Sequence, residues 1–80
     1  MLNYIKMNAT LNGYMIFIKY GSARDFQPLV WTFQEGEGNT CREECIESAL
    51  DTNHHFNFYQ DEKEGKAKCE PVTITVKLKQ

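Results

Sequence analysis

The chain has 80 residues, the size of one small domain with a thin hydrophobic core. Its composition, 41% hydrophobic and 25% charged, is ordinary for a soluble protein, and no segment approaches the roughly 20 apolar residues of a membrane-spanning helix. A net charge of −2 is too small to attract or repel nucleic acid by itself. We therefore expect one compact domain over residues 1–80 that acts through its surface, since a thin core leaves little room for a deep active site.

Two segments in the first half of the chain alternate in the manner of β-strands. Residues 14–20 place apolar side chains on both faces, which predicts an interior strand. Residues 29–34 form the second strand, and we expect Pro28 at its start because proline has no N–H to donate to a neighbouring strand. Residues 1–12 either add an extra strand or form a tail, and Met7 is an alternative start of the chain.

The segment from Thr40 to Asp51 is the one clear helix. Its apolar side chains recur at helical spacing and form a single face, consisting of Cys41, Cys45, Ile46, Ala49 and Leu50. Thr40 is the predicted N-cap, and Glu43 completes a capping box with it. We expect the helix to end between Asp51 and Asn53, because asparagine tolerates the left-handed conformation of a helix C-terminus.

Two more strands are predicted after the helix. Residues 54–60 alternate around Phe56 and Phe58, and residues 61–68 form a charged turn. In the last strand, the side chains predicted to face the core are Val72, Ile74, Val76 and Leu78. The threonines and lysines between them form a solvent-exposed face. This pattern is typical of a strand at the edge of a sheet, where lysine discourages pairing with other molecules. The order β-β-α-β-β predicts an α+β fold, with one helix on one face of a mainly antiparallel sheet of about four strands.

Charge is distributed unevenly along the chain. Residues 1–34 carry +2 and residues 65–80 carry +3, whereas residues 35–64 carry nine acids against two bases, a net charge of −7. The acids on the exposed side of the predicted helix are Glu43, Glu44, Glu47 and, nearby, Asp51. Such a face suits a protein partner with a basic surface, and these four are the predicted partner-binding residues. A solvated helix exterior is the alternative, because exposed helix faces are usually charged.

Three cysteines and two adjacent histidines are the residues that suggest chemistry. Cys41, Cys45 and Cys69 could form a zinc site with one histidine, but two of these thiols lie on the apolar helix face, where cysteine acts as a small hydrophobe. We expect no metal, no cofactor and, in a reducing compartment, no Cys45–Cys69 disulfide. Adjacent residues on a strand point to opposite faces, so we expect His54 to pack beneath the helix end and His55 to be exposed. No residue is predicted to be catalytic, and the chain is not expected to be an enzyme.

Large aromatic side chains are frequent on the predicted strands. They are Tyr14, Tyr20, Trp31, Phe33, Phe56, Phe58 and Tyr59. Such rings can stack on the bases of single-stranded nucleic acid. The sequence lacks the basic residues between the rings that such platforms need, so we expect these rings to fill the core. A single-stranded nucleic-acid-binding module and a zinc-binding mini-domain are therefore the alternatives to a protein-binding function.

These observations favour a small non-catalytic binding protein that inhibits a partner by masking its surface. In size, mild acidity and lack of a catalytic motif, the chain resembles the short proteins that bacteriophages encode to disable host machinery, including anti-CRISPR inhibitors. The resemblance implies a protein partner in the bacterial cytoplasm and inhibition without catalysis, and it carries over no functional residues. The first ten residues lack the sustained apolar run of a signal peptide, so we expect a cytoplasmic protein with no membrane partner, either a monomer or a homodimer.

Overall fold

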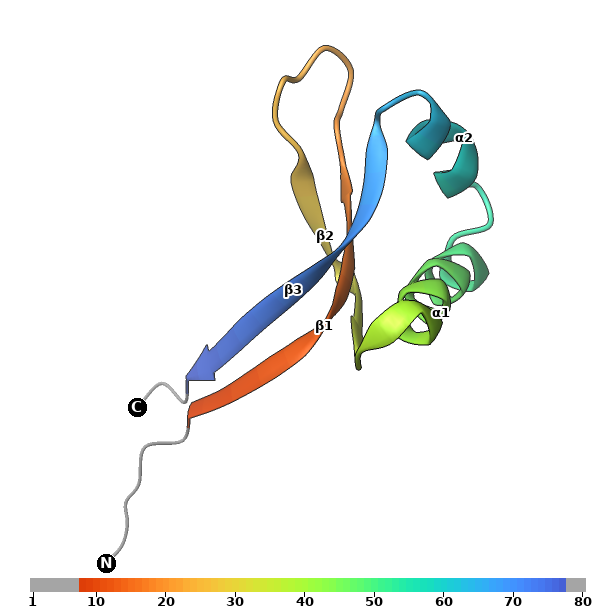
Figure 1. Ribbon diagram of the computed structural model, residues 1–80. Coiled ribbons are helices and arrows are strands. Elements are labelled where there is room, and N and C mark those ends of the chain that lie inside the picture. Colours follow the sequence, from red (N-terminus) through yellow and green to blue (C-terminus); the bar gives the residue numbers. More distant parts are fainter. Residues whose placement is uncertain (1–7, 78–80) are drawn as a thin grey trace, which may run out of the picture.

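The computed structural model describes residues 8–77 and is a small α+β fold, as predicted (Figure 1). Its elements are β1 (Asn8–Ile18), β2 (Gln27–Glu35), α1 (Gly38–Thr52), α2 (Phe58–Lys63) and β3 (Ala67–Lys77). Within the described residues the fold therefore has three strands and two helices, whereas about four strands and one helix were expected. The additional helix is α2, which replaces the strand predicted at residues 54–60.

The three strands form one antiparallel sheet in the order β2-β1-β3. The central position of β1 confirms the interior strand predicted from its two apolar faces, and β3 lies at an edge, as predicted. Residues 8–12 belong to β1, while the remainder of the possible N-terminal tail lies outside the described residues. β3 begins at Ala67, earlier than expected, because Ala67 and Cys69 pair with the apolar end of β1.

A large bulge interrupts the pairing between β1 and β2. Tyr14 pairs with Gln34, but Ile16, two residues later, pairs with Leu29, so β2 contains three more residues than β1 over this interval. The hydroxyl of Thr32 closes the gap: it accepts a hydrogen bond from the Ile16 N–H (2.9 Å) and donates one to the Leu29 carbonyl (2.6 Å). The bulge is thereby held in place by a buried side chain, and it exposes Val30 and Trp31 to solvent.

The hydrophobic core lies where α1 and α2 cover one face of the sheet. The buried residues of this core are Ile16, Cys45, Ile46, Ala49, Phe58, Ala67 and Cys69. The apolar face predicted for the helix is confirmed, with four of its five residues buried and Leu50 packed against the core. The inward face predicted for the last strand is wrong, because the buried residues of β3 have the opposite parity. Val72 and Ile74 are only half-buried and Val76 is 48% exposed, while Leu78 lies outside the described residues.

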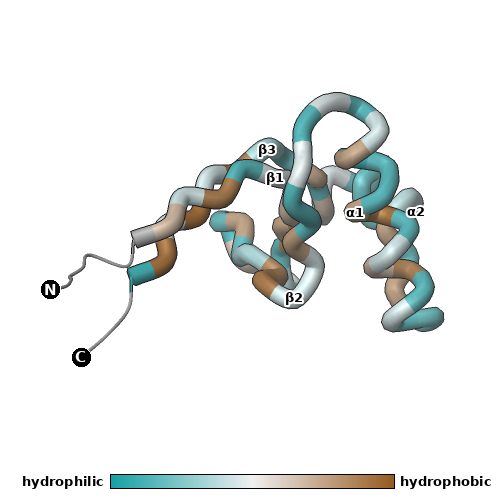
Figure 2. The backbone as a smooth tube through the Cα atoms, turned by 90° about the horizontal axis from the view of Figure 1, so that it is seen from below, coloured by the Kyte–Doolittle hydropathy of each residue, from teal (hydrophilic) through white to brown (hydrophobic). Residues whose placement is uncertain are grey.

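The far ends of β1 and β3 project beyond the helices as a two-stranded arm, formed by residues 8–12 and 73–77 (Figure 1). Apolar and polar residues alternate along both strands of the arm, visible as brown segments in Figure 2. Leu11 pairs with Ile74 on one face, and Asn12 pairs with Thr73 on the other. The helical layer covers only the core end of the ribbon, so the apolar side chains of the arm keep part of their surface in solvent.

The segment after α1 is helical because its polar side chains bond locally. The Oδ1 atom of Asn53 accepts a hydrogen bond from the His55 N–H, and that of Asn57 accepts one from the Gln60 N–H at the start of α2. These bonds turn the chain and cap a short helix, so the alternation of Phe56 and Phe58 does not reflect a strand. Phe58 is buried in the core as a helical residue.

α1 begins two residues before the predicted N-cap. Its N-cap is Glu37, no side chain caps it, and Thr40 lies inside the first turn, so the predicted capping box is absent. The earlier start is possible because Gly36 and Gly38 adopt positive φ angles of 143° and 82°, which turn the chain sharply out of β2. The helix ends at Thr52, as predicted, although Asn53 is extended rather than left-handed.

Candidate functional site

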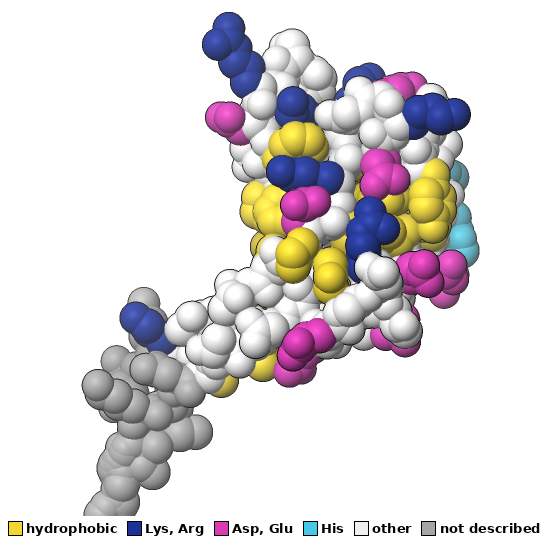
Figure 3. Space-filling view, in the orientation of Figure 1, with side chains coloured by type: hydrophobic (Ala, Val, Ile, Leu, Met, Phe, Trp, Pro, Cys, Tyr) yellow, Lys and Arg dark blue, Asp and Glu magenta, His cyan; other side chains and the backbone are white. Residues whose placement is uncertain are grey.

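The outward face of α1 is acidic. The structure places all four predicted partner-binding residues in solvent, and they are Glu43, Glu44, Glu47 and Asp51. Within residues 8–77 none of the four forms an ion pair: Arg42 pairs with Glu62 (3.0 Å) and Lys66 with Glu64 (3.3 Å). Figure 3 shows acidic side chains gathered beside a histidine at the right of the view, where α1 lies. We call these four residues the acidic face.

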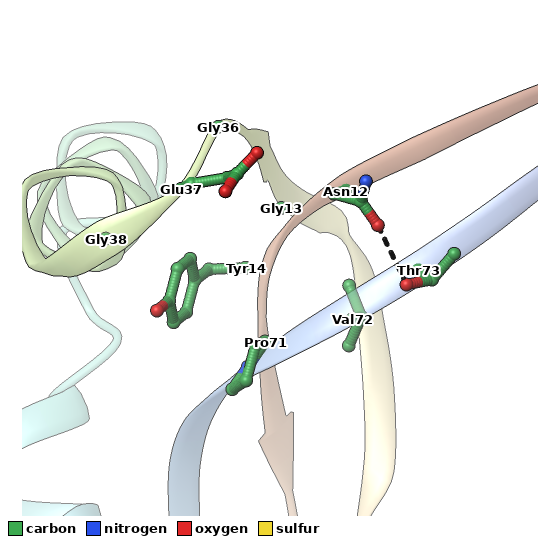
Figure 4. Close-up of a pocket in the computed structure, with 9 residues that line it drawn as sticks. All are labelled: Asn12, Gly13, Tyr14, Gly36, Glu37, Gly38, Pro71, Val72 and Thr73. Atoms are coloured by element: carbon green, nitrogen blue, oxygen red, sulfur yellow. Dashed lines mark hydrogen bonds between the residues drawn. The ribbon is translucent and has the colours of Figure 1, made fainter.

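A pocket of about 390 Å³ lies at the other end of α1, at the root of the arm (Figure 4). It is bounded by the turn between β2 and α1 and by the facing parts of β1 and β3. Tyr14 and Pro71 form one side of it, and Glu37 extends over it from the turn. Asn12 and Thr73 form the opposite side, where the Thr73 hydroxyl donates a hydrogen bond of 2.9 Å to Asn12 Oδ1.

The groups around this pocket are suited to binding a cationic or hydrogen-bonding ligand. Glu37 supplies an exposed carboxylate, Tyr14 an aromatic ring and Asn12 an amide. None of these residues was predicted as a site residue, because the pocket forms only when three segments that are distant in the sequence come together. The sequence feature that comes closest to predicting this pocket is Gly36-Glu37-Gly38, which places a carboxylate on a tight turn.

The three cysteines are free and buried. Their thiols donate to backbone carbonyls: Cys41 to Gln34 (3.4 Å), Cys45 to Thr32 (3.2 Å) and Cys69, weakly, to Arg42 (4.0 Å). Burial, and secondarily the Glu44 carboxylate, raises the pKa of Cys41. The hydrogen bond to Cys45, together with burial, raises the pKa of Cys69. Cys41 and Cys69 are therefore protonated at neutral pH and poorly nucleophilic.

The histidines lie away from the thiols and from the pocket. His54 and His55 are both exposed in the turn between α1 and α2, so the expectation that His54 packs beneath the helix end is wrong. Because residues 54 and 55 lie in this turn and not in a strand, neither imidazole ring is placed against the core. Among the described residues, no three side chains of His, Cys, Asp or Glu come together as metal ligands.

The aromatic side chains do not form a single platform, and the expectation that they fill the core is wrong for Tyr20, Trp31 and Tyr59, which are more than half exposed. Three of the predicted rings lie in or beside α2 rather than on a strand, and Phe58 is fully buried. On the sheet, the β2 bulge leaves Trp31 51% exposed and Val30 65% exposed. The face of the sheet away from the helices carries a different group: Lys19 and Lys68 place their ammonium nitrogens 4.7 and 4.4 Å from the ring centre of Phe26.

Comparison of the chain with protein-family models, curated proteins and solved structures found no match. Within residues 8–77, neither helix combines the length and the apolar character that a bilayer crossing requires.

Proposed function

We propose that the protein is a small non-catalytic binding protein that inhibits a protein partner by masking a basic surface with the acidic face of α1. The observation that supports this proposal best is the set of four exposed carboxylates, none of which forms an ion pair within residues 8–77. Arg42, the basic residue within α1, is already paired with Glu62. The negative potential of the face is therefore available to a partner.

Charge alone gives encounter rate and orientation more than affinity, so the interface also needs an apolar anchor. The helical side of the molecule offers Tyr59, which is 56% exposed on α2 and packs edge-to-face on the buried Phe58 at 5.5 Å. A ring held by a core residue loses little conformational freedom on binding. We therefore place Tyr59 at the interface together with the acidic face.

Non-catalytic action accords with the chemistry of the described residues. All three thiols are buried, and both histidines lie in an exposed turn. The resemblance to phage-encoded inhibitors of host machinery makes a partner in the bacterial cytoplasm part of the proposal, with no cofactor and no membrane component.

The decisive experiment measures association with a partner recovered by affinity capture from the native host. The variant that combines Glu44→Lys and Glu47→Lys should associate more slowly, and its association rate should depend less on salt, when surface plasmon resonance is recorded at low and high ionic strength. A matched control combines Asp25→Lys and Glu35→Lys, which changes the net charge equally at two exposed positions outside α1. Equal association rates for the two variants at low salt would contradict the proposal.

A single-stranded nucleic-acid-binding module is the second candidate. It is favoured by the two lysines beside Phe26, because basic groups next to aromatic rings are what such proteins use. Fluorescence anisotropy with labelled oligonucleotides separates the two functions. Binding that is lost in the variant combining Lys19→Glu and Lys68→Glu, but kept when the acidic face is reversed, would replace the proposal above.

A further inference from the structure

We propose that two copies of the chain pair edge to edge through β3, residues 72–76 running antiparallel about a two-fold axis at Ile74. The side chains along this edge are exposed or half-buried, and the helices cover β3 only at its Ala67 end (Figure 1). Protein edges are usually blocked by charge or proline, but the five residues between Pro71 and Lys77 contain neither.

The hydrogen-bonding groups of the open edge follow from the pairing with β1. The Lys19 N–H bonds to the Lys66 carbonyl, and bonded pairs alternate along an antiparallel ladder. Residues 68, 70, 72, 74 and 76 therefore bond to β1, and the odd-numbered residues of β3 direct their N–H and C=O groups outward. Pro71, which has no N–H, falls on this outward set. Thr73 and Thr75 thus present free donors and acceptors to a second strand.

The sequence of this edge reads the same in both directions: Val-Thr-Ile-Thr-Val. Antiparallel pairing centred on Ile74 places Ile74 opposite Ile74 and each Val72 opposite Val76 of the second copy. It also places each Thr73 opposite Thr75 of the second copy. The N–H and C=O groups of both residues point away from β1, so they can hydrogen-bond across the two-fold axis. Centring on Thr73 would place Glu70 opposite Val76. The Ile74 register is the one in which every residue of 72–76 meets a side chain of its own kind, as cross-strand pairing favours.

Charge complementarity supports the same register. In this register, Lys77 of the second copy lies opposite Pro71. Its side chain is therefore on the face of the sheet that carries Pro71 and Thr73. These two residues line the pocket at the root of the arm, over which Glu37 extends (Figure 4). The lysine that would otherwise block the edge is thereby directed to a carboxylate of its partner. The geometry assigns the pocket to the Lys77 side chain of a second copy.

Cysteine cross-linking tests both the dimer and its register. Ile74→Cys should form a disulfide-linked dimer under mild oxidation, because the two copies of this residue face each other across the axis. Val76→Cys is the stringent control: Val76 is more exposed than Ile74, yet its two copies lie four residues apart along the strands, about 14 Å. Random collisions would cross-link Val76→Cys at least as readily, and that result would overturn the register.

Sedimentation equilibrium of the full chain tests the ion pair. Lys77→Glu and Glu37→Lys should each raise the dimer dissociation constant about two- to thirtyfold, because the two-fold dimer contains two such exposed pairs, and the chain that carries both changes should recover most of the affinity. A parent chain that sediments as a monomer at every concentration up to its solubility limit would overturn the proposal. If the effects of the two substitutions are additive, Lys77 and Glu37 do not interact across the dimer, and the proposed binding of Lys77 at the pocket is wrong.

Discussion

Replacing Thr32 by valine tests whether one hydroxyl holds the β2 bulge. Valine keeps the shape of the side chain and its packing, so the substitution removes only the two hydrogen bonds of the hydroxyl. The Ile16 N–H loses its acceptor at 2.9 Å, and the Leu29 carbonyl loses its donor at 2.6 Å. Thr32 is 4% exposed and Ile16 fully buried, so water cannot readily replace the hydroxyl at the amide.

The expected cost follows from these two groups. A buried backbone group without a partner costs about 1–3 kcal/mol, and the half-buried Leu29 carbonyl regains part of its loss from water, so we expect Thr32→Val to lower the free energy of unfolding by about 2–3 kcal/mol. Thr32→Ser keeps the hydroxyl and removes one methyl group, which is worth about 0.8 kcal/mol. The serine variant should therefore be the more stable of the two, although it is the smaller side chain.

Urea unfolding provides the measurement, with far-ultraviolet circular dichroism for the whole fold and fluorescence of Trp31 for the bulge. Trp31 is the single tryptophan and is adjacent to Thr32, so its signal reports the local structure directly. A valine variant as stable as the parent chain, or a serine variant less stable than the valine one, would refute the role of the hydroxyl.

Three further predictions concern the core and the cysteines. Ile46→Ala should cost about 2–4 kcal/mol by urea unfolding, and Leu50→Ala should cost less because Leu50 is half-buried; equal costs would mean that the buried face of α1 is wrongly assigned. Gly36→Ala should destabilise the fold by more than about 1 kcal/mol, since φ is +143° and the new Cβ would come within 2.9 Å of Cys41 Sγ; a variant with parental stability would show that the turn adjusts. The raised pKa of Cys41 should make stability fall above about pH 8.5, where the unfolded thiol ionises and the folded one does not, by at most about 1.4 kcal/mol per pH unit. Cys41→Ala should show a smaller slope between pH 8.5 and 9.5, and an unchanged slope would exclude this thiol as the cause.

The sequence predicts the parts of the fold in which local pattern and tertiary contact agree. The apolar face of α1 recurs at helical spacing and is buried, and the two apolar faces of β1 correspond to its central position in the sheet. The acidic face could be predicted for the same reason, since helical spacing alone decides which residues face solvent. Each of these features depends on one segment and its period.

One of the errors arises from a local helix cap, and two arise where a second segment decides. Phe56 and Phe58 alternate as strand residues do, but the Asn57 side chain caps a helix there. The most apolar residues of β3 are Val72, Ile74 and Val76, yet the helices cover the opposite face and only the other end of the strand, so Ala67 and Cys69 are buried instead. The pocket was missed because its walls come from three segments. The hydrophobic period of a single segment does not specify where the helices lie over the sheet or how long the β2 bulge is.

The two proposals use separate surfaces, and this separation has a consequence for binding. The pairing edge is the β3 side of the arm, whereas the acidic face is the outward side of α1, so a dimer would present two acidic faces at once. A partner with two basic sites would then bind the second face at the effective concentration set by the first. The disulfide-linked Ile74→Cys dimer should accordingly dissociate from an immobilised bivalent partner more slowly than Lys77→Glu applied well below its dimer dissociation constant, where it is a monomer with an unchanged acidic face. Equal dissociation rates would mean that the partner engages one copy at a time, and that pairing through β3 contributes nothing to inhibition.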